Sequence, residues 1–445
     1  MLAFMAAAIL GAGPLESVPT GFQLTFQGAF SADRGDAGAG EKTFELQYFV
    51  RHEGTQTSLC WTLDERGLGI GSWLSRFGRL VLDAEGRAVE GISPTLYYQR
   101  AEGTSVVPIS LPVLAPSSPL QLGASWQERG LEYEVAASER LGNDDAWRID
   151  VRSAIGRRRT LWRDTASPFL LATDDVVFVG QGEQHSLRYR LIQRQQLDEA
   201  VAGQLFAAFD ELAKLREGLK FETPGTEFIW TPARLALVKS TLPNVLTKAR
   251  PTPLAKLAQA AEQQGSREQD RRAAIGAMET KLVGRAAPRP RLAQVNGEEL
   301  DWRSLEGKVI LLHFWEYRDV PLEEPYGQVA YLDFIARKYA STDLKVWGII
   351  EDERMASPDT RRAGIQSAKR LQSFMNLSYP LLADEGGAIR AFGDPRVTGA
   401  KLPLVVVIDR TGKVIHYHAG HYELNRDLGL EELDGIVKQA LGTGE

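Results

Sequence analysis

Apolar and polar residues alternate along the first part of the chain. The alternation is clearest in five segments, at residues 22–26, 43–48, 131–135, 147–151 and 186–191. Because successive side chains of a strand point to opposite faces, this pattern predicts strands with one buried face. Turn-forming residues such as Gly142-Asn143 and Gly180-Gln181-Gly182 separate the segments. Residues 21–197 are therefore expected to form a β-rich domain with an antiparallel sheet, either curved or closed.

The period changes to that of helices after this region. Apolar residues recur at spacings of four, three, four and three, at Val201, Leu205, Ala208, Leu212 and Leu215. Helical patterns continue to about residue 282, with an interruption expected at Pro243 and a new helix expected at a Ser266/Gln269 capping box. The run 286–291, with two prolines, reads as an extended linker. Residues 198–290 are thus expected to form a helical connector and linker.

Strand and helix periods alternate in the remaining chain, residues 291–445. The predicted strands are 309–315, 344–350, 379–382, 404–408 and 413–417, and helical segments lie between several of them and at the end. The segment 309–315 is apolar almost throughout, which is typical of a central strand covered on both faces. This order predicts an α/β sandwich with a mixed sheet that ends in an antiparallel hairpin. The whole chain is accordingly expected to be a multidomain α+β protein.

Composition limits the possible functions. The chain has 445 residues, with 52 Lys and Arg against 58 Asp and Glu, so its formal charge is −6. An acidic balance does not suit a general nucleic-acid binder, because neutralising phosphates requires a basic surface. The apolar residues 1–10 are too short to span a membrane but have the length of a signal-peptide core, so residues 1–20 are expected to be a truncated signal peptide. No other segment has transmembrane length. The expected location is the periplasm or cell envelope, and otherwise the cytoplasm.

The C-terminal third resembles the thioredoxin superfamily, most closely the TlpA-like and redoxin (AhpC/TSA-like) branch. The resemblance covers roughly residues 290–442 and depends on several ordered segments. Residues 309–315 (VILLHFW) are similar to the strand that delivers the active site. Residues 402–409 (LPLVVVID) look like the cis-proline loop and the strand after it, and residues 412–415 (GKVI) look like the next hairpin arm. The resemblance implies a thioredoxin-like α/β sandwich.

The chain departs from this family at the chemistry. Family members carry a Cys-x-x-Cys motif directly after the first central strand, whereas residues 314–322 of this chain read FWEYRDVPL. The two cysteine positions are therefore Asp319 and Leu322, although the intervening Pro321 remains. Disulfide exchange requires an attacking thiolate and a resolving thiol. The single cysteine, Cys60, lies in a strand-like segment of the β-rich domain and is interpreted as a core residue. No catalytic residue and no cofactor are expected.

Three functional hypotheses remain open. In the first, the thioredoxin-like groove binds a protein or peptide without redox turnover, with Trp315, Tyr317, Asp319, Pro321 and Pro403 as binding residues. Under a purely structural alternative, Pro403 only shapes a loop and Asp319 caps the next helix. In the second hypothesis the protein is a cell-envelope thiol-disulfide oxidoreductase or redoxin, as the fold implies. In the third, the β-rich domain, with six of the nine tryptophans before residue 231, carries an apolar ligand.

Three of the six histidines lie close together near the C-terminus, at His416, His418 and His421. On a strand, the first two point to the same face, and imidazole groups arranged in this way can bind zinc or copper. The alternative is an exposed edge strand with polar side chains, which is the favoured interpretation. No metal is therefore expected.

Overall fold

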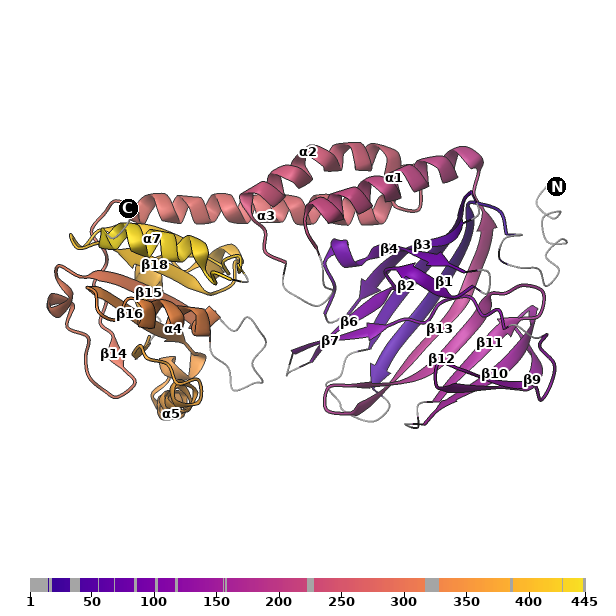
Figure 1. Cartoon of the computed structure of the whole chain (residues 1–445), viewed down its shortest axis with the longest axis horizontal. Helices are drawn as coiled ribbons and strands as arrows, with labels where there is room; N and C mark the ends of the chain where they lie inside the picture. Colours follow the sequence, from indigo (N-terminus) through magenta and orange to yellow (C-terminus); the bar gives the residue numbers. More distant parts are fainter. Residues whose placement is uncertain are drawn as a thin grey trace. The chain divides into compact units, whose positions relative to one another are not determined.

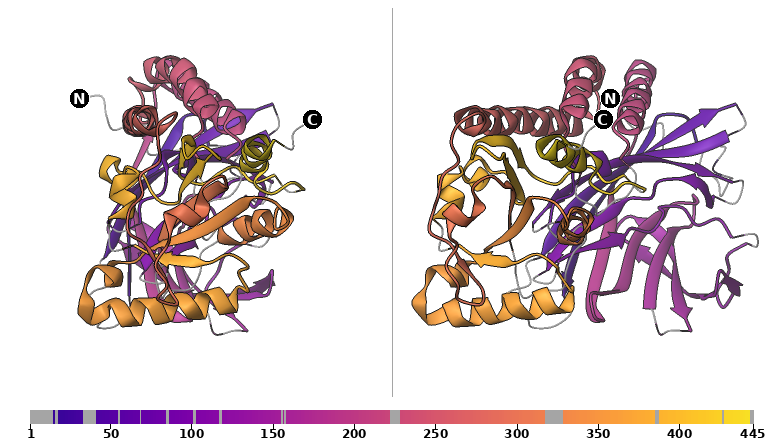
Figure 2. Two further views of the ribbon diagram at one scale, coloured as in Figure 1. Left: turned by 90° about the vertical axis from the view of Figure 1, so that its left-hand side faces the viewer. Right: turned by 60° about the vertical axis from the view of Figure 1, so that its left-hand side comes forward.

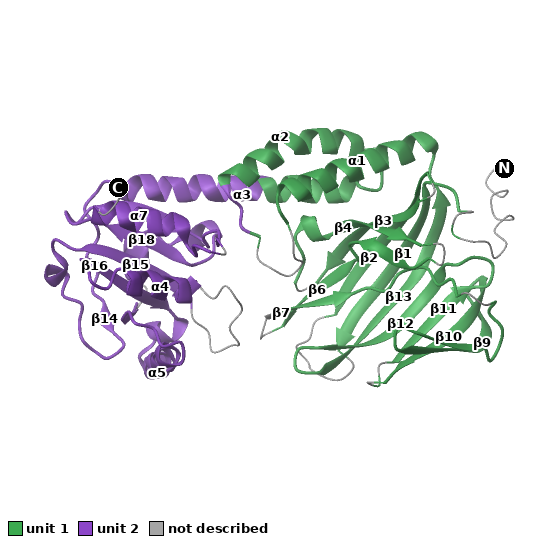
Figure 3. Cartoon of the chain, in the orientation of Figure 1, with its two compact units in different colours: residues 1–228, 232–265 green, residues 229–231, 266–445 purple. Residues whose placement is uncertain are grey.

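The computed structural model describes most of the chain, and it divides the chain into two compact units. The described residues are 15, 18–32, 41–54, 56–67, 69–83, 86–100, 103–116, 119–154, 156, 158–221, 228–316, 328–384, 387–425 and 427–442. The first unit comprises residues 1–228 and 232–265, and the second comprises residues 229–231 and 266–445 (Figure 3). The predicted signal peptide falls almost entirely outside the described residues.

A curved antiparallel sheet dominates the first unit (Figure 1). Eleven strands follow the order β5-β4-β3-β2-β1-β13-β12-β11-β10-β9-β8, so the described strands form an open sheet with two edges and not a closed barrel. A separate two-stranded sheet pairs β6 with β7. The strands are β1 Phe22–Ala32, β2 Lys42–Glu53, β3 Gln56–Arg66, β4 Phe77–Leu82, β5 Ala88–Gly91, β6 Thr95–Arg100, β7 Gly103–Pro108, β8 Ser125–Glu128, β9 Leu131–Leu141, β10 Asp144–Ser153, β11 Arg158–Asp164, β12 Leu170–Val179 and β13 Glu183–Gln196, with a 3₁₀ turn η2 at Trp73–Ser75.

The two faces of this sheet differ, as the alternating pattern predicts. One face carries buried residues such as Phe26, Leu46 and Leu187, which form a core with Leu96 of β6 and Val107 of β7. Polar side chains dominate much of the opposite face. The antiparallel β-rich domain expected from the sequence is therefore confirmed, and its core is aromatic and aliphatic.

A buried ion pair lies where β2 and β3 meet the two-stranded sheet. Lys42 Nζ is 3.6 Å from Glu65 Oε1, and both side chains are fully buried. The Glu65 carboxylate accepts hydrogen bonds from the backbone N–H of Gly71 and of Tyr97, each at 3.0 Å. Lys42 Nζ also donates to Gly69 O at 2.8 Å. Burial lowers the pKa of Lys42 and raises that of Glu65, and the attraction between them opposes both shifts.

Three helices follow the last strand of this sheet: α1 Glu199–Gly218, α2 Pro232–Ala249 and α3 Ala255–Leu282. Helix α1 packs on one end of the sheet, where the rings of Phe49 and Phe209 lie 5.9 Å apart. At this place Arg51 Nη1 also donates to Asp210 Oδ1 at 2.6 Å.

Two predicted interruptions of these helices are wrong. Helix α2 continues through Pro243, because Val238, Leu242 and Val245 on both sides of the proline are buried on one face. Helix α3 runs through Ser266, so this residue is not an N-cap. Gly265, directly before it, is a weak helix former. Its lower helix propensity costs about 1 kcal/mol relative to Ala, which is not enough to end a 28-residue helix.

The second unit contains a six-stranded mixed sheet with the order β14-β17-β16-β15-β18-β19. Strands β15, β16 and β17 are parallel, whereas β18 pairs antiparallel with both β15 and β19. The strands are β14 Ala293–Gln294, β15 Val309–Glu316, β16 Leu344–Glu351, β17 Leu381–Ala383, β18 Leu404–Ile408 and β19 Val414–Ala419. The helices are α4 Val329–Lys338, α5 Pro358–Phe374, α6 Ala388–Ala391 and α7 Glu431–Leu441, with 3₁₀ turns η3 Trp302–Leu305, η5 Glu353–Ala356 and η6 Pro395–Thr398.

Helices cover both faces of this sheet, and they can be followed in Figure 2. On one face, residues of β15 such as Leu311 form a core with α4, α5 and α7. On the other face, residues such as Leu312 pack with α6 and with the C-terminal half of α3. This arrangement confirms the expected thioredoxin-like α/β sandwich. Among the described residues, no helix is long and apolar enough to cross a membrane.

Candidate functional site

The ends of four neighbouring strands meet at one edge of the second sheet. Glu316, the last residue of β15, lies beside Glu351, the last residue of β16. Ile350 pairs with Ala383 at the end of β17, while Leu404 at the start of β18 lies beside Phe314. Ligands of α/β sheets commonly bind outside the carboxyl ends of parallel strands. We refer to the residues at and directly beyond these strand ends as the strand-end edge.

Two of the predicted binding residues lie at this edge. The Leu402–Pro403 peptide bond is cis, which agrees with the predicted cis-proline loop. Pro403 O accepts a hydrogen bond from Gly420 N at 2.8 Å, so the loop is tied to the end of β19. Trp315 is fully buried in the core formed with α4 and α7. Its ring therefore packs inside the domain under the strand-end edge and is not accessible to a ligand.

The remaining predicted binding residues, Tyr317, Asp319 and Pro321, lie outside the described residues, as does Leu322. The described chain resumes at Gln328, whose side chain is buried. Gln328 Nε2 donates to Tyr422 O at 2.8 Å, and its Oε1 accepts from Tyr422 N at 3.0 Å. Helix α4 thus starts from a residue that is fixed to the loop between β19 and α7.

The backbone N–H and C=O of Leu402 are available to a ligand. Within the described parts of the chain, we find no hydrogen-bond partner for its N–H or its C=O. Regular pairing of β18 begins two residues later, at Leu404. Unpaired backbone groups beside a strand favour the addition of another extended segment.

The three histidines that are candidate but not favoured metal ligands lie in a different part of the unit. His416 Nε2 lies 2.7 Å from Tyr422 Oη, and the His418 ring stacks on the Tyr422 ring with centroids 3.9 Å apart. Burial lowers the pKa of each of these two histidines to about 4, so both are neutral at pH 7. Among the described residues, no group of three or more His, Cys, Asp or Glu side chains is placed to hold a metal ion.

Sequence reasoning missed a group of three charged side chains at the strand-end edge, at Glu351, Asp384 and Arg396. Arg396 Nη2 donates to Glu351 Oε2 at 3.0 Å. Glu351 and Asp384 directly follow the paired residues Ile350 and Ala383, so the two carboxyl groups are neighbours, and Asp384 contributes to the raised pKa of Glu351. A signal was present in the sequence, because Glu351 and Asp384 are the first charged residues after two apolar segments predicted as strands.

Cys60 lies in β3 of the first unit, and its exposed fraction is 1%. Burial raises the pKa of its thiol to about 12, although Arg51 and Arg79 oppose that shift. A thiol of this kind is protonated and shielded at neutral pH, which disfavours nucleophilic attack. The structure therefore agrees with the interpretation of Cys60 as a core residue.

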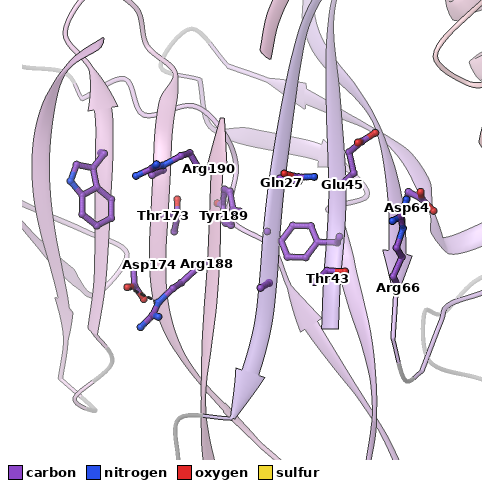
Figure 4. Close-up of a pocket in the computed structure, with 15 residues that line it drawn as sticks. Gln27, Thr43, Glu45, Asp64, Arg66, Thr173, Asp174, Arg188, Tyr189 and Arg190 are labelled. Atoms are coloured by element: carbon purple, nitrogen blue, oxygen red, sulfur yellow. Dashed lines mark hydrogen bonds and ion pairs between the residues drawn. The ribbon is translucent and has the colours of Figure 1, made fainter. Parts of the chain in front are cut away.

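The first unit has a separate pocket of about 640 Å³ on the polar face of its sheet (Figure 4). The register places Arg190, Gln27 and Glu45 side by side on three adjacent strands. Arg188 Nε donates to Asp174 Oδ2 at 2.9 Å, as the dashed line in Figure 4 shows. Charged and polar side chains share the lining with the aromatic residues Phe44, Trp162 and Tyr189. This mixed lining suits a ligand that has both polar and apolar groups.

Fold and sheet topology define the second unit as a thioredoxin-like domain. Residues 283–417 match the family model of the AhpC/TSA family. The thiol-disulfide oxidoreductase ResA of Bacillus thuringiensis subsp. konkukian is 23% identical over 158 residues, which are 35% of this chain and 78% of ResA. ResA of Bacillus anthracis is 24% identical over 161 residues, or 36% of this chain and 80% of the relative.

Solved structures of proteins named as thiol:disulfide interchange proteins match a similar share of the chain. A thioredoxin family thiol:disulfide interchange protein from Chlorobium tepidum is 23% identical, with a TM-score of 0.28, and the match covers 36% of this chain and 99% of the other. A thiol:disulfide interchange protein from a Bacteroides species is 14% identical, with a TM-score of 0.27, and the match covers 36% and 90%.

Proposed function

We propose that the thioredoxin-like unit binds an extended protein or peptide segment at its strand-end edge and does not itself exchange disulfides. The observation that carries this proposal is the position of the only cysteine. Cys60 belongs to the first unit, is buried and has a raised pKa, and residues 266–445 contain no thiol. Since thiol-disulfide exchange passes through a mixed disulfide, it needs a reactive thiol at the site.

The backbone of Leu402 supports the binding part of the proposal. Its N–H and C=O are placed beside the cis-proline loop without a partner among the described residues, so they can pair with an extended chain. Val397 in η6 lies five residues before Leu402 in the sequence and is 77% exposed. An exposed apolar residue in the segment that leads to unpaired backbone groups suits a polypeptide ligand better than a small ion.

A binding measurement with a matched pair of variants tests the proposal. The probe is fluorescently labelled, reduced and carboxymethylated α-lactalbumin, a soluble unfolded polypeptide, and the protein is the full chain. We expect Val397→Glu to weaken binding about fivefold or more, because losing roughly 1 kcal/mol of apolar contact changes Kd by that factor.

Phe374→Glu is the matched control. Phe374 is 81% exposed and ends α5, at the opposite end of the sheet from the strand-end edge, and its replacement changes the charge by the same amount. We expect this variant to bind as the wild type does, within about twofold. Equal weakening by both variants, or no saturable binding by the wild type, would contradict the proposal.

The alternative is a thiol-disulfide oxidoreductase, which is the activity named in the ResA relatives. It would require the first unit's Cys60 or a thiol supplied by another molecule. Turnover that disappears in Cys60→Ser would favour this alternative over the binding proposal.

The apolar-ligand hypothesis concerns the first unit and stays open beside the main proposal. The pocket is large enough for a small molecule, but charged side chains such as Arg66, Asp64 and Arg190 line it. Native mass spectrometry of the intact protein would show a co-purifying molecule and its mass. Location in the cell envelope likewise remains a proposal that depends on the apolar residues 1–10.

A further inference from the structure

Three charged side chains join three elements at the strand-end edge. Glu351 is the last residue of β16, Asp384 directly follows β17, and Arg396 lies in η6. Asp384 accepts hydrogen bonds from the backbone N–H of residues 387, 388 and 389, at 2.9, 2.9 and 2.8 Å. Arg396 donates both to Glu351, at 3.0 Å, and to Asp394, at 2.8 Å. The group therefore holds both ends of the segment 387–399.

One oxygen of the buried Glu351 carboxyl has no hydrogen-bond donor among the described residues. The Glu351 side chain is only 5% exposed, and its Oε2 accepts from Arg396, so the oxygen concerned is Oε1. The neighbouring acid is Asp384, which already accepts hydrogen bonds from three N–H groups and offers no donor as a carboxylate. A proton on Glu351 would satisfy its orphaned oxygen by donation to Asp384, so the geometry favours a protonated Glu351.

The electrostatic surroundings agree with this assignment. Burial, followed by the negative charge of Asp384, raises the pKa of Glu351 to about 8, and Arg396 only partly opposes the shift. The other charged groups nearby are paired or point to solvent. Asp352 pairs with Arg354 at 2.6 Å, Asp394 pairs with Arg396, and Glu316 on the neighbouring strand is exposed.

The segment held by these side chains leads directly to the proposed binding residue. The turn η6 closes at Gly399, whose N–H donates to Arg396 O at 2.9 Å. Only Ala400 and Lys401 separate this turn from Leu402. Tyr417 Oη also donates to Gly393 O at 2.8 Å, so the segment is tied at its middle as well as at its ends.

We propose that Glu351, Asp384 and Arg396 form a one-proton clamp, which holds residues 387–399 on the strand ends and so positions Leu402 for its ligand. These three are positioning residues, since Glu351 and Asp384 are buried and the hydrogen bonds that all three make join elements of the protein itself. Loss of the proton leaves two buried carboxylates side by side, and their repulsion loosens the segment. The role of the clamp in ligand binding rests on the proposed function, whereas the clamp itself does not.

Amide hydrogen exchange and infrared spectroscopy on the full chain test the clamp without any ligand. In the wild type we expect a protonated-carboxyl C=O band that disappears with a midpoint near pH 8. Over the same range, exchange at residues 387–399 should accelerate about tenfold beyond its intrinsic pH dependence. Glu351→Gln keeps a donor to Asp384 and an acceptor for Arg396 at every pH. This variant should lose the band and keep the segment protected.

A second variant keeps the test decisive if Glu351→Gln does not fold. Arg396→Met removes the cation that lowers the pKa of Glu351, so the carboxyl band should persist and its midpoint should move to higher pH. Residues 394–399 should lose protection even at pH 7. Absence of a protonated-carboxyl band from the wild type, or a band that Glu351→Gln leaves unchanged, would overturn the clamp.

The unfolded α-lactalbumin probe then separates the two proposals. If the band and the exchange titrate as expected but the wild type binds no probe at any pH, the clamp stands and the proposed function fails. If the wild type binds equally well at pH 7 and pH 9 while the segment loosens, the positioning role fails. Support for both requires that binding weakens above pH 8 in the wild type and not in Glu351→Gln.

Discussion

Each of the two units buries a carboxyl group near a cation, but the two sites differ in how charge is balanced. In the first unit, Glu65 and Lys42 are both fully buried, and two backbone N–H groups also donate to the carboxylate. In the second unit, Glu351 lies beside another acid, Asp384, its Oε1 has no donor among the described residues, and its pKa is raised to about 8. A buried ion pair whose charges balance commonly has a structural role. Groups with strongly shifted pKa values at the ends of strands are more typical of functional sites.

The two units also differ in where the cysteine and the strand-end edge lie. The only cysteine lies inside the first unit, where burial makes it unreactive. The thioredoxin-like unit has the strand ends and the cis-proline loop but no thiol. The comparison teaches that the strand ends and the cis-proline loop of this fold can be present in a unit that contains no thiol, so the fold alone does not specify the chemistry.

The largest effect should come from breaking the balanced pair in the first unit. Lys42→Met leaves the Glu65 carboxylate buried without its cation, and removing one partner of a buried pair typically costs about 3–5 kcal/mol. We expect the free energy of unfolding of the first unit to fall by that amount. Hydrogen exchange at the slowest amides of β2 and β3 measures it.

The double variant Lys42→Met with Glu65→Gln is the control for this experiment. A neutral amide no longer leaves an unpaired charge, so the double variant should recover a large part of the loss. If Lys42→Met and the double variant are equally unstable, the ion pair is not the reason for the loss.

A comparable effect, spread over several pH units, is expected from the titration of Glu351. Its usual pKa is 4.5 and its pKa in the fold is about 8, so the folded state binds the proton more tightly. The contribution of Glu351 to the free energy of unfolding of the second unit is greatest below pH 4.5. It falls as the pH rises toward 8, by up to about 1.4 kcal/mol per pH unit. The unfolding free energy of wild type and Glu351→Gln, compared from pH 5 to 8, measures this slope. Parallel curves for the two proteins would contradict it.

The pH dependence of stability that comes from His416 and His418 should have the opposite sign. The pKa of His416 and of His418 is lowered from 6.5 to about 4, so stability from these groups is present above pH 6.5 and is lost as the pH falls toward 4. Replacing both with Gln should reduce the acid sensitivity of this unit. Thermal unfolding between pH 4 and 7 tests the prediction, and an unchanged slope would count against it. The first unit should show no matching change.

The smallest effect is expected at the two exposed apolar residues. Val397→Glu and Phe374→Glu each change a solvent-facing side chain, so the unfolding free energy should remain within about 0.5 kcal/mol of the wild type. Chemical denaturation measures both values. A larger loss in Val397→Glu would mean that weakened probe binding reflects unfolding of η6 and not a lost contact.

Much of the fold could be predicted from the pattern of apolar residues. The strand expected at 404–408 is β18, Leu404–Ile408, and the strand expected at 309–315 is β15, Val309–Glu316. The predicted break at Ser266 was wrong because capping motifs also occur inside long helices, where packing decides the outcome. Whether the first sheet closes could not be predicted, since alternation within a strand does not specify which strands pair.

The candidate site could be predicted only in part. Pro403 was found because its loop has a recognisable sequence, and it lies at the strand-end edge. Glu351, Asp384 and Arg396 were missed because their meeting depends on the spatial order of β16, β17 and η6, which periodicity does not contain. The strand that contains Trp315 was predicted correctly. The sequence does not show, however, that its side chain points into the core with α4 and α7 and not toward a ligand.

The most direct test of the central claim is insulin reduction by dithiothreitol, with the wild-type chain beside Cys60→Ser and a thioredoxin as positive control. The account predicts that the wild type and Cys60→Ser both leave the rate at that of dithiothreitol alone, because the thioredoxin-like unit has no thiol and Cys60 is buried. A wild-type rate well above this background would contradict the claim that the unit does not exchange disulfides.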